Sequence, residues 1–195
     1  MRYPLTIYAD ERGPVTVSFS ATDNLSGVAS TMFSTNGGAT WTTGTSVTLK
    51  ADGIYNVLFH STDVAGNIET GKLTQVKIDQ TPPIITATAN PALLWPPDGK
   101  MVRVTISGTM TDSLSGVNAA IAAFAVKDEY GLVQPSGPVS LGANGIYAVT
   151  ILLEAQRNGN DPNGRLYSIT VAAFDNAGNG STSTAAVIVP HEQGE

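Results

Sequence analysis

Apolar and polar residues alternate with a period of two along most of this 195-residue chain. In residues 15–20 and 102–107, every second residue is Val, Ile or Phe, and the residues between them are Ser, Thr or Arg. Such alternation buries one face of a strand and leaves the other face toward solvent. Clusters of Gly, Asn, Asp and Pro separate these segments, and a helical period is nearly absent. The pattern therefore predicts an all-β protein built of many short antiparallel strands.

Two short motifs each occur twice in the chain. The sequence Thr-Asp-Asn-Leu-Ser-Gly-Val at 22–28 matches Thr-Asp-Ser-Leu-Ser-Gly-Val at 111–117. The sequence Asp-Val-Ala-Gly-Asn at 63–67 matches Asp-Asn-Ala-Gly-Asn at 175–179. Repeated motifs in the same order indicate two copies of one structural unit.

Each copy also has a tyrosine at the same distance before its second motif. Tyr55 and Tyr167 lie early in the segment expected to be the penultimate strand. Immunoglobulin-like sandwiches place a tyrosine there, and its hydroxyl bonds to nearby backbone. Two residues later, where many immunoglobulin domains carry cysteine, the chain has Val57 and Ile169. Because the chain has no cysteine, each sandwich must be held together by apolar packing.

The joint between the copies is expected at Ile78 to Pro83. Two consecutive prolines there stiffen the chain and block strand pairing across the joint. We therefore predict two tandem immunoglobulin-like antiparallel β-sandwiches, at residues 1–80 and 81–195. The second copy has more residues between its first motif and its tyrosine, which predicts an extra hairpin around Gly145 to Asn160.

Composition disfavours several classes of function. The chain has 10 Lys and Arg against 16 Asp and Glu, a net charge of −6, which argues against a nucleic-acid or anionic-membrane partner. No stretch approaches the roughly 18 apolar residues of a membrane span. Without cysteine there is no thiol nucleophile, and the two histidines, His60 and His191, lie outside any catalytic motif. We therefore expect a protein that is not an enzyme, binds no nucleic acid and does not insert into a membrane.

Four segments resemble bacterial immunoglobulin-like extracellular modules, the repeats found in large secreted glycosidases, proteases and adhesins. They are residues 20–28, 34–41 and 61–67 of the first copy and residues 94–102, Leu-Trp-Pro-Pro-Asp-Gly-Lys-Met-Val, of the second. The resemblance implies tandem immunoglobulin-like or fibronectin-type domains of a larger bacterial protein, located outside the cell or on its surface. It implies a non-catalytic spacer or accessory module that positions a catalytic or adhesive domain. The partners would be the other domains of the parent protein.

The alternative function is a binding module for a cell-surface glycan or protein, acting in adhesion. Trp41 and Trp95 would supply planar rings that stack on a sugar. The opposing interpretation is that Trp41 covers an edge of its core and that Trp95 seals the end of its sandwich. Sheet edges would also offer protein contacts. We nevertheless expect a monomer.

The acidic residues of the two motifs are candidate calcium ligands. In a sandwich the loops that carry the two motifs lie at the same end, so their side chains would offer converging oxygen atoms, which Ca²⁺ prefers. The linker enters the second copy at that end, so one linker aspartate would join them. The alternative is that these side chains only bond the backbone N–H groups of their own turns. The candidate ligands are Asp23, Asp63, Asn67, Asp79, Asp112, Asp175 and Asn179.

Overall fold

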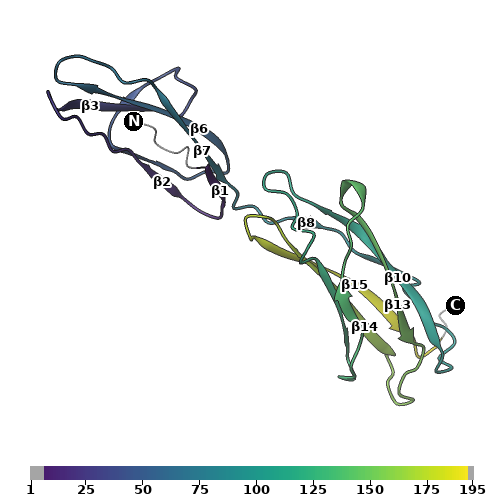
Figure 1. Cartoon of the computed structure of the whole chain (residues 1–195). Coiled ribbons are helices and arrows are strands. Elements are labelled where there is room, and N and C mark those ends of the chain that lie inside the picture. Colours follow the sequence, from purple (N-terminus) through teal and green to yellow (C-terminus); the bar gives the residue numbers. More distant parts are fainter. Residues whose placement is uncertain (1–6, 193–195) are drawn as a thin grey trace. The chain divides into compact units, whose positions relative to one another are not determined.

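Strands account for nearly all regular structure in this computed structural model, which describes residues 7–192 (Figure 1). The described residues contain no α-helix and one short 3-10 turn, at Ala143–Gly145. Accordingly, no helix in this range is long and apolar enough to cross a membrane. The chain divides into two compact units, Met1–Thr81 and Pro82–Glu195, hereafter unit 1 and unit 2. The prediction of an all-β protein is confirmed.

Unit 1 is a sandwich of a five-stranded sheet and a two-stranded sheet. The large sheet has the order β1-β7-β6-β3-β4, and the small sheet pairs β2 with β5. β1 runs parallel to β7, and the other pairs are antiparallel. The strands are β1 (Ile7–Glu11), β2 (Val15–Ser18), β3 (Val28–Ser34), β4 (Thr42–Thr43), β5 (Ser46–Leu49), β6 (Gly53–Asp63) and β7 (Lys72–Ile78).

Inward-facing residues of both sheets form the core of unit 1. Phe19, just after β2, packs its ring against Phe33 and Phe59, with centroid distances of 5.4 and 4.9 Å. Val57 and Val76 in the same cluster are fully buried. Burying one such side chain contributes about 1.5–3 kcal/mol. Apolar packing of this kind therefore takes the place of a disulfide.

Unit 2 also consists of two sheets. In one sheet β13 pairs with one side of β10, and β8 and β9 pair with the other side. The second sheet has the order β12-β11-β14-β15. The strands are β8 (Ile84–Ile85), β9 (Thr88–Asn90), β10 (Met101–Thr111), β11 (Ala123–Asp128), β12 (Ser136–Pro138), β13 (Ile146–Glu154), β14 (Arg165–Phe174) and β15 (Gly180–Val189).

The two units share one strand order. In both, the penultimate strand lies between the last strand and the strand that follows the first motif, as β7-β6-β3 in unit 1 and β15-β14-β11 in unit 2. A short strand, β4 or β12, then extends the same sheet. This is the arrangement of an immunoglobulin-like sandwich. The predicted fold, two tandem immunoglobulin-like β-sandwiches, is confirmed.

Both predicted corner tyrosines bond to backbone. Tyr55 donates its hydroxyl to the carbonyl oxygen of Ala51 at 2.9 Å. Tyr167 donates its hydroxyl to the carbonyl oxygen of Glu154, also at 2.9 Å. The side chain two residues after each tyrosine is fully buried, in the position where many immunoglobulin domains carry cysteine.

About half of the additional length between the first motif and the tyrosine of unit 2 lies in a longer strand and a longer loop. β13 has 9 residues, whereas β5, its counterpart in unit 1, has 4. A loop at residues 155–164 then leads to β14. Between Gly145 and Asn160 the chain forms β13 and part of this loop, and not the expected extra hairpin. The reason is that β13 pairs with β10, while β14 pairs within the opposite sheet.

Candidate functional site

The first motif of unit 1 forms a loop closed by its aspartate. Asp23 accepts hydrogen bonds from the backbone N–H groups of Leu25 and Gly27 at 3.2 and 2.7 Å. It also accepts one from the hydroxyl of Ser26. The bond from Gly27, followed by that from Leu25, holds the pKa of Asp23 below its usual value. A carboxylate that accepts several N–H bonds is stabilised in its charged form, so Asp23 is ionised at neutral pH.

The second motif of unit 1 forms a turn around Asp63. Its carboxylate accepts hydrogen bonds from the side-chain amide and the backbone N–H of Asn67, both at 2.7 Å. These bonds, the side-chain bond first, lower the pKa of Asp63. The backbone N–H of Val64 donates to the carbonyl oxygen of Gly27 at 2.9 Å, which joins the two motifs. Turn chemistry, one of the two alternatives, therefore operates in both loops.

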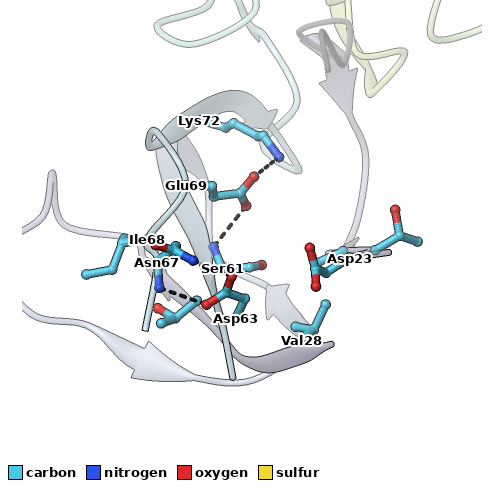
Figure 2. Close-up of a pocket in the computed structure, with 11 residues that line it drawn as sticks. Asp23, Val28, Ser61, Asp63, Asn67, Ile68, Glu69 and Lys72 are labelled. Atoms are coloured by element: carbon cyan, nitrogen blue, oxygen red, sulfur yellow. Dashed lines mark hydrogen bonds and ion pairs between the residues drawn. The ribbon is translucent and has the colours of Figure 1, made fainter. Parts of the chain in front are cut away.

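The two motifs of unit 1 also line a pocket (Figure 2). The pocket has a volume of about 320 Å³, and Asp23 and Asp63 lie on its wall beside the apolar side chains of Val28 and Ile68. Two ionised carboxylates give the pocket a negative potential and oxygen atoms that suit a hard cation. The other lining residues are Ala21, Thr22, Ser61, Thr62, Asn67, Glu69 and Lys72.

Unit 2 repeats these bonds. Asp112 accepts hydrogen bonds from the backbone N–H groups of Leu114 and Gly116 at 3.1 and 2.7 Å. Asp175 accepts two hydrogen bonds from Asn179, one from its backbone and one from its side chain, both at 2.7 Å. The residue after Asp175 donates its backbone N–H to the carbonyl oxygen of Gly116 at 2.9 Å. The repeated motifs thus form the same pair of joined loops in both units.

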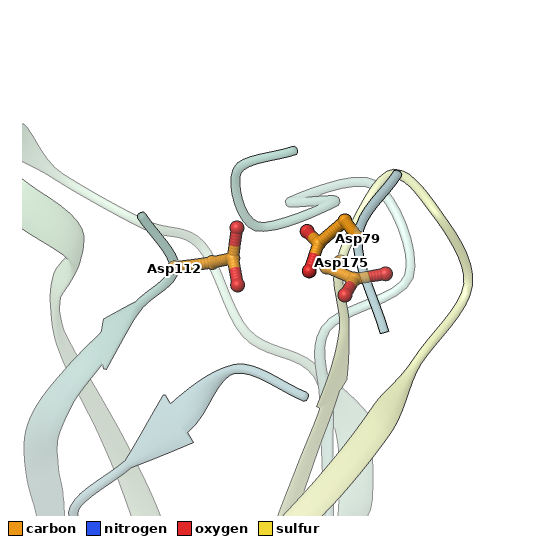
Figure 3. A group of neighbouring side chains, drawn as sticks. All are labelled: Asp79, Asp112 and Asp175. Carbon is orange, nitrogen blue, oxygen red and sulfur yellow. The ribbon is translucent and has the colours of Figure 1, made fainter. Parts of the chain in front are cut away.

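The two copies differ in how deeply the second motif is buried. Asp175 and Asn179 are buried, whereas Asp63 is partly exposed and Asn67 is exposed. Carboxylate oxygens of Asp112 and Asp175 lie within 4.8 Å of each other in unit 2 (Figure 3). Two carboxylates at this separation can share one cation, since each keeps lone pairs that its N–H partners do not use.

Asp79, the remaining predicted ligand, belongs to unit 1 and is buried. Its backbone N–H donates to the carbonyl oxygen of Glu11 at 2.9 Å, and its carboxylate accepts a hydrogen bond from the N–H of Thr81 at 3.1 Å. Asp79 thus closes a turn directly after β7. That it joins the ligands of unit 2, and that any of the seven residues binds calcium, stays a prediction.

Both tryptophans leave part of their rings exposed. Trp41 is 37% exposed, and its ring centroid lies 4.6 Å from that of His60. The Nδ1 atom of His60 is buried and has no hydrogen-bond partner within residues 7–192. Trp95 is 38% exposed and follows the fully buried Leu94. Both tryptophans are therefore partly exposed, and stacking on a sugar requires an exposed ring.

A buried ion pair in unit 2 is missing from the sequence-based prediction. Arg165 pairs with Asp128, and both side chains are almost completely buried. Its guanidinium also lies 3.2 Å from a carboxylate oxygen of Glu154 and faces the rings of Tyr130 and Tyr167, at 5.1 and 4.6 Å from their centroids. A signal for it exists: Arg165 stands two residues before Tyr167, so the period-two alternation places it on the inward face of β14.

By fold, then, the chain is a pair of immunoglobulin-like modules whose shared loops are held by their own hydrogen bonds. Solved structures of similar fold include fibronectin(III)-like modules of Clostridium thermocellum CbhA, with a TM-score of 0.39, 16% identity, and coverage of 94% of this chain and 90% of that chain. The D00-D0 domain of intimin has a TM-score of 0.41 and 14% identity, covering 95% and 96%. A Ca²⁺-stabilized ice-binding adhesin of an Antarctic bacterium has a TM-score of 0.41 and 20% identity, covering 91% and 43%. These likenesses are partial, and the immunoglobulin-like fold of the chain follows from its own strand order and corner tyrosines.

No family model and no curated protein sequence matches the chain. The similarity to the solved structures therefore concerns the fold alone, and any functional conclusion must come from the residues of the two units themselves.

Proposed function

We propose that the two units are a non-catalytic spacer or accessory module of a larger bacterial secreted or surface protein, where they position a catalytic or adhesive domain. The observation that carries this proposal is the repetition of the same bonded loops in both units. The polar side chains that both copies share form hydrogen bonds within their own loops, so their role is to stabilise the fold. Two rigid modules in series are suited to hold neighbouring domains at a set distance.

The linker between the units supports this role, because unit 1 forms hydrogen bonds with the start of the linker and unit 2 forms one with its end. In unit 1, Asp52 accepts hydrogen bonds from the N–H of Gln80 at 2.9 Å and from the hydroxyl of Thr81 at 2.6 Å. In unit 2, Ser181 donates its hydroxyl to the carbonyl oxygen of Pro83. The bonds from Thr81 and then Gln80 lower the pKa of Asp52, so its carboxylate is charged and bonded at neutral pH. The two prolines restrict the few remaining torsions.

Distance measurement between labels on the two units tests the spacer proposal. Since the chain has no cysteine, Thr70→Cys and Asn160→Cys introduce unique attachment sites on exposed residues of units 1 and 2. We expect a narrow distance distribution that broadens in Asp52→Ala. The matched control is Asp98→Ala, which removes an exposed carboxylate of unit 2 that accepts hydrogen bonds from Lys100. A distribution as broad in the otherwise unchanged chain as in Asp52→Ala would contradict a spacer of fixed length.

A second candidate function is glycan binding in adhesion, and the exposed ring of Trp41 beside His60 favours it. Glycan-array binding that is lost in a folded Trp41→Ala variant would support this function, and Trp95→Ala would show which unit carries the site. The function is contradicted if the unaltered chain binds no glycan on the array.

Calcium binding is the third proposal, and the convergent carboxylates of each unit support it. Unit 1 contributes Asp23 and Asp63 in its pocket, and unit 2 contributes Asp112 and Asp175. Because affinity follows the number of charged ligands, such sites would be weak. We expect calcium, but not magnesium, to raise the melting temperature, and Asp23→Asn to reduce the shift. A calcium titration that leaves both the melting temperature and the label distances unchanged would contradict this proposal.

A further inference from the structure

The edge strands of the two units differ in how well they are protected. β4 and β12 have 2 and 3 residues, and β12 ends in Pro138, which cannot donate a ladder hydrogen bond. β2 and β5 have 4 residues each. The edge of β15 is covered in part, because Ile188 exchanges backbone hydrogen bonds with residues 92–94. Short length, proline and cover are the usual means by which proteins prevent edge-to-edge association.

β13 has little of this protection: at its first residue the carbonyl oxygen of Ile146 accepts a bond from the backbone N–H of Gly142 at 2.8 Å, and the edge beyond Ile146 is open. It has 9 residues and pairs with β10 along its whole length without a register shift. Within residues 7–192, no other strand pairs with it. From Ile146 to Leu153 it contains no charged residue, no proline and no glycine. A long, regular and uncharged edge presents a row of backbone donors and acceptors to any strand that can match it.

The outward face of β13 is apolar at both ends and small in the middle. Ile146 and Leu152 are 58% and 45% exposed, and Ala148 and Thr150 between them are also exposed. The residues in alternation with them point into the core. The strand is therefore fixed by its inner face, while its outer face and its free edge remain available.

We propose that β13 pairs antiparallel with β13 of a second copy of this chain, around a two-fold axis at Val149. In this register Ile146 of one copy lies opposite Leu152 of the other, and Ala148 lies opposite Thr150. The pairing is self-complementary, because each large apolar residue meets another and no charge meets a like charge. Shifting the axis to Thr150 would instead place Ile146 opposite Glu154, a charged residue, so the register at Val149 is favoured.

The pairing covers only residues 146–152 of each copy. One such strand pair falls short of the ~1,000 Å² that a stable interface requires, so the dimer is weak in solution. It gains strength where several copies stand on one surface, since the local concentration is then high. This self-association departs from the monomer expected from the sequence, and it does not depend on the proposed spacer role.

Sedimentation of the full chain from micromolar to millimolar concentration tests the pairing. The double variant Ala148→Lys/Thr150→Lys places lysine opposite lysine twice in the proposed dimer, and we expect at least a tenfold weaker association, about the effect of like charges in direct opposition. The matched control is Ser107→Lys/Thr105→Lys, because these residues face Ala148 and Thr150 from the central strand β10. The control should associate like the unaltered chain.

Mixing a lysine variant with a glutamate variant tests the same contact by a gain of association. A misfolded variant could lose association, but it could not gain a specific partner. An equimolar mixture of Ala148→Lys/Thr150→Lys with Ala148→Glu/Thr150→Glu should form heterodimers, since each lysine then meets a glutamate. The proposal is overturned if the unaltered chain stays monomeric at millimolar concentration, if the lysine variant associates as well as its control, or if the mixture shows no heterodimer.

Cysteine trapping tests the register. Opposed residues of a strand pair lie within disulfide reach, and the chain has no cysteine of its own. We expect a mixture of Ala148→Cys and Thr150→Cys to form a mixed disulfide under oxidation, while neither variant alone crosslinks readily. A covalent homodimer of Thr150→Cys alone would overturn the register around Val149.

Discussion

The backbone N–H of Val64 donates a hydrogen bond to the carbonyl oxygen of Gly27 at 2.9 Å, and this bond joins the two motifs of unit 1. The equivalent bond in unit 2 runs from Asn176 to Gly116, also at 2.9 Å. Both bonds are backbone to backbone, so they do not depend on the side chain of the donor residue. The second position of the second motif can therefore be valine in unit 1 (Val64) and asparagine in unit 2 (Asn176). In each unit the two loops therefore act as one structural element.

Removing the asparagine of the second motif should cost more stability in unit 2 than in unit 1. Asn179→Ala removes the side-chain amide that donates to the buried carboxylate of Asp175, while the backbone N–H bond stays, and losing this one donor costs about 1–3 kcal/mol. Asn67→Ala removes the equivalent side chain at an exposed site, where water replaces it, at a cost below about 1 kcal/mol. Urea unfolding of the two variants measures the difference. Equal losses would show that burial does not set the strength of this motif.

Breaking the buried ion pair should destabilise unit 2 strongly. Arg165→Met leaves Asp128 charged and buried without its main partner, which costs about 3–5 kcal/mol. The double variant Arg165→Met/Asp128→Leu should recover part of this loss, because both charges are then gone. The surface variant Lys100→Met, whose partner is Asp98, is the matched control and should change the stability little.

The same ion pair predicts how acid weakens unit 2. Burial alone would raise the pKa of Asp128, but hydrogen bonds, led by that from Arg165, outweigh burial and lower it. Since the pKa is depressed in the folded state, the pair contributes stability above the unfolded value of about 3.9. That contribution is lost as pH falls through the folded pKa. Acid unfolding should be less steep in Arg165→Met/Asp128→Leu, and an unchanged slope would contradict this assignment.

Alkaline pH should act through the corner tyrosine of unit 2. Burial raises the pKa of Tyr167 to about 12, so the folded protein holds this proton more tightly than the unfolded chain. The resulting stabilisation is complete below the unfolded pKa of about 10 and is lost as pH rises toward 12. In Tyr167→Phe this part of the alkaline loss should disappear, as measured by unfolding between these pH values. Tyr55→Phe, at a half-buried site, is the comparison.

A methyl group at Gly108 should disrupt the first sheet of unit 2. A Cβ at this position would lie 2.0 Å from the carbonyl oxygen of Thr86, which also accepts the hydroxyl of Tyr147 at 2.7 Å. Gly108→Ala must therefore move the strand segment around Thr86, with an expected cost of about 2–4 kcal/mol. Gly71→Ala is the control, since a Cβ there meets no atom within 4 Å. Similar melting temperatures for the two variants would contradict this close approach.

The sequence was sufficient for features that depend on local pattern and repetition. Period-two alternation identifies the strands, and the spacing of Tyr55 and Tyr167 from the second motif identifies both corner tyrosines. The burial of Val57 and Ile169 follows from the same alternation. These features are determined by residues close together in the chain, which is why a single sequence contains them.

Long-range partners could not be predicted in this way. Alternation places Arg165 on an inward face, but its partner Asp128 lies 37 residues away on another strand, and nothing local selects it. The longer unit 2 likewise suggested an extra hairpin, because residue count alone does not distinguish a longer β13 from a new strand pair. For the candidate calcium ligands, the sequence predicted which residues lie in the loops, but not that the second motif is buried in unit 2 and exposed or half-buried in unit 1.

The difference in length between β5 and β13 also bears on how two similar neighbours fold from one chain. Adjacent domains with matching sequences are prone to exchange strands as they fold, which yields mixed, misassembled species. β5, with 4 residues, cannot fill the place of β13, which pairs with β10 over 9 residues. Such an exchange would leave more than half of the β13 side of β10 without a partner. The different lengths of β5 and β13 therefore disfavour strand exchange, so that during synthesis each strand pairs within its own unit.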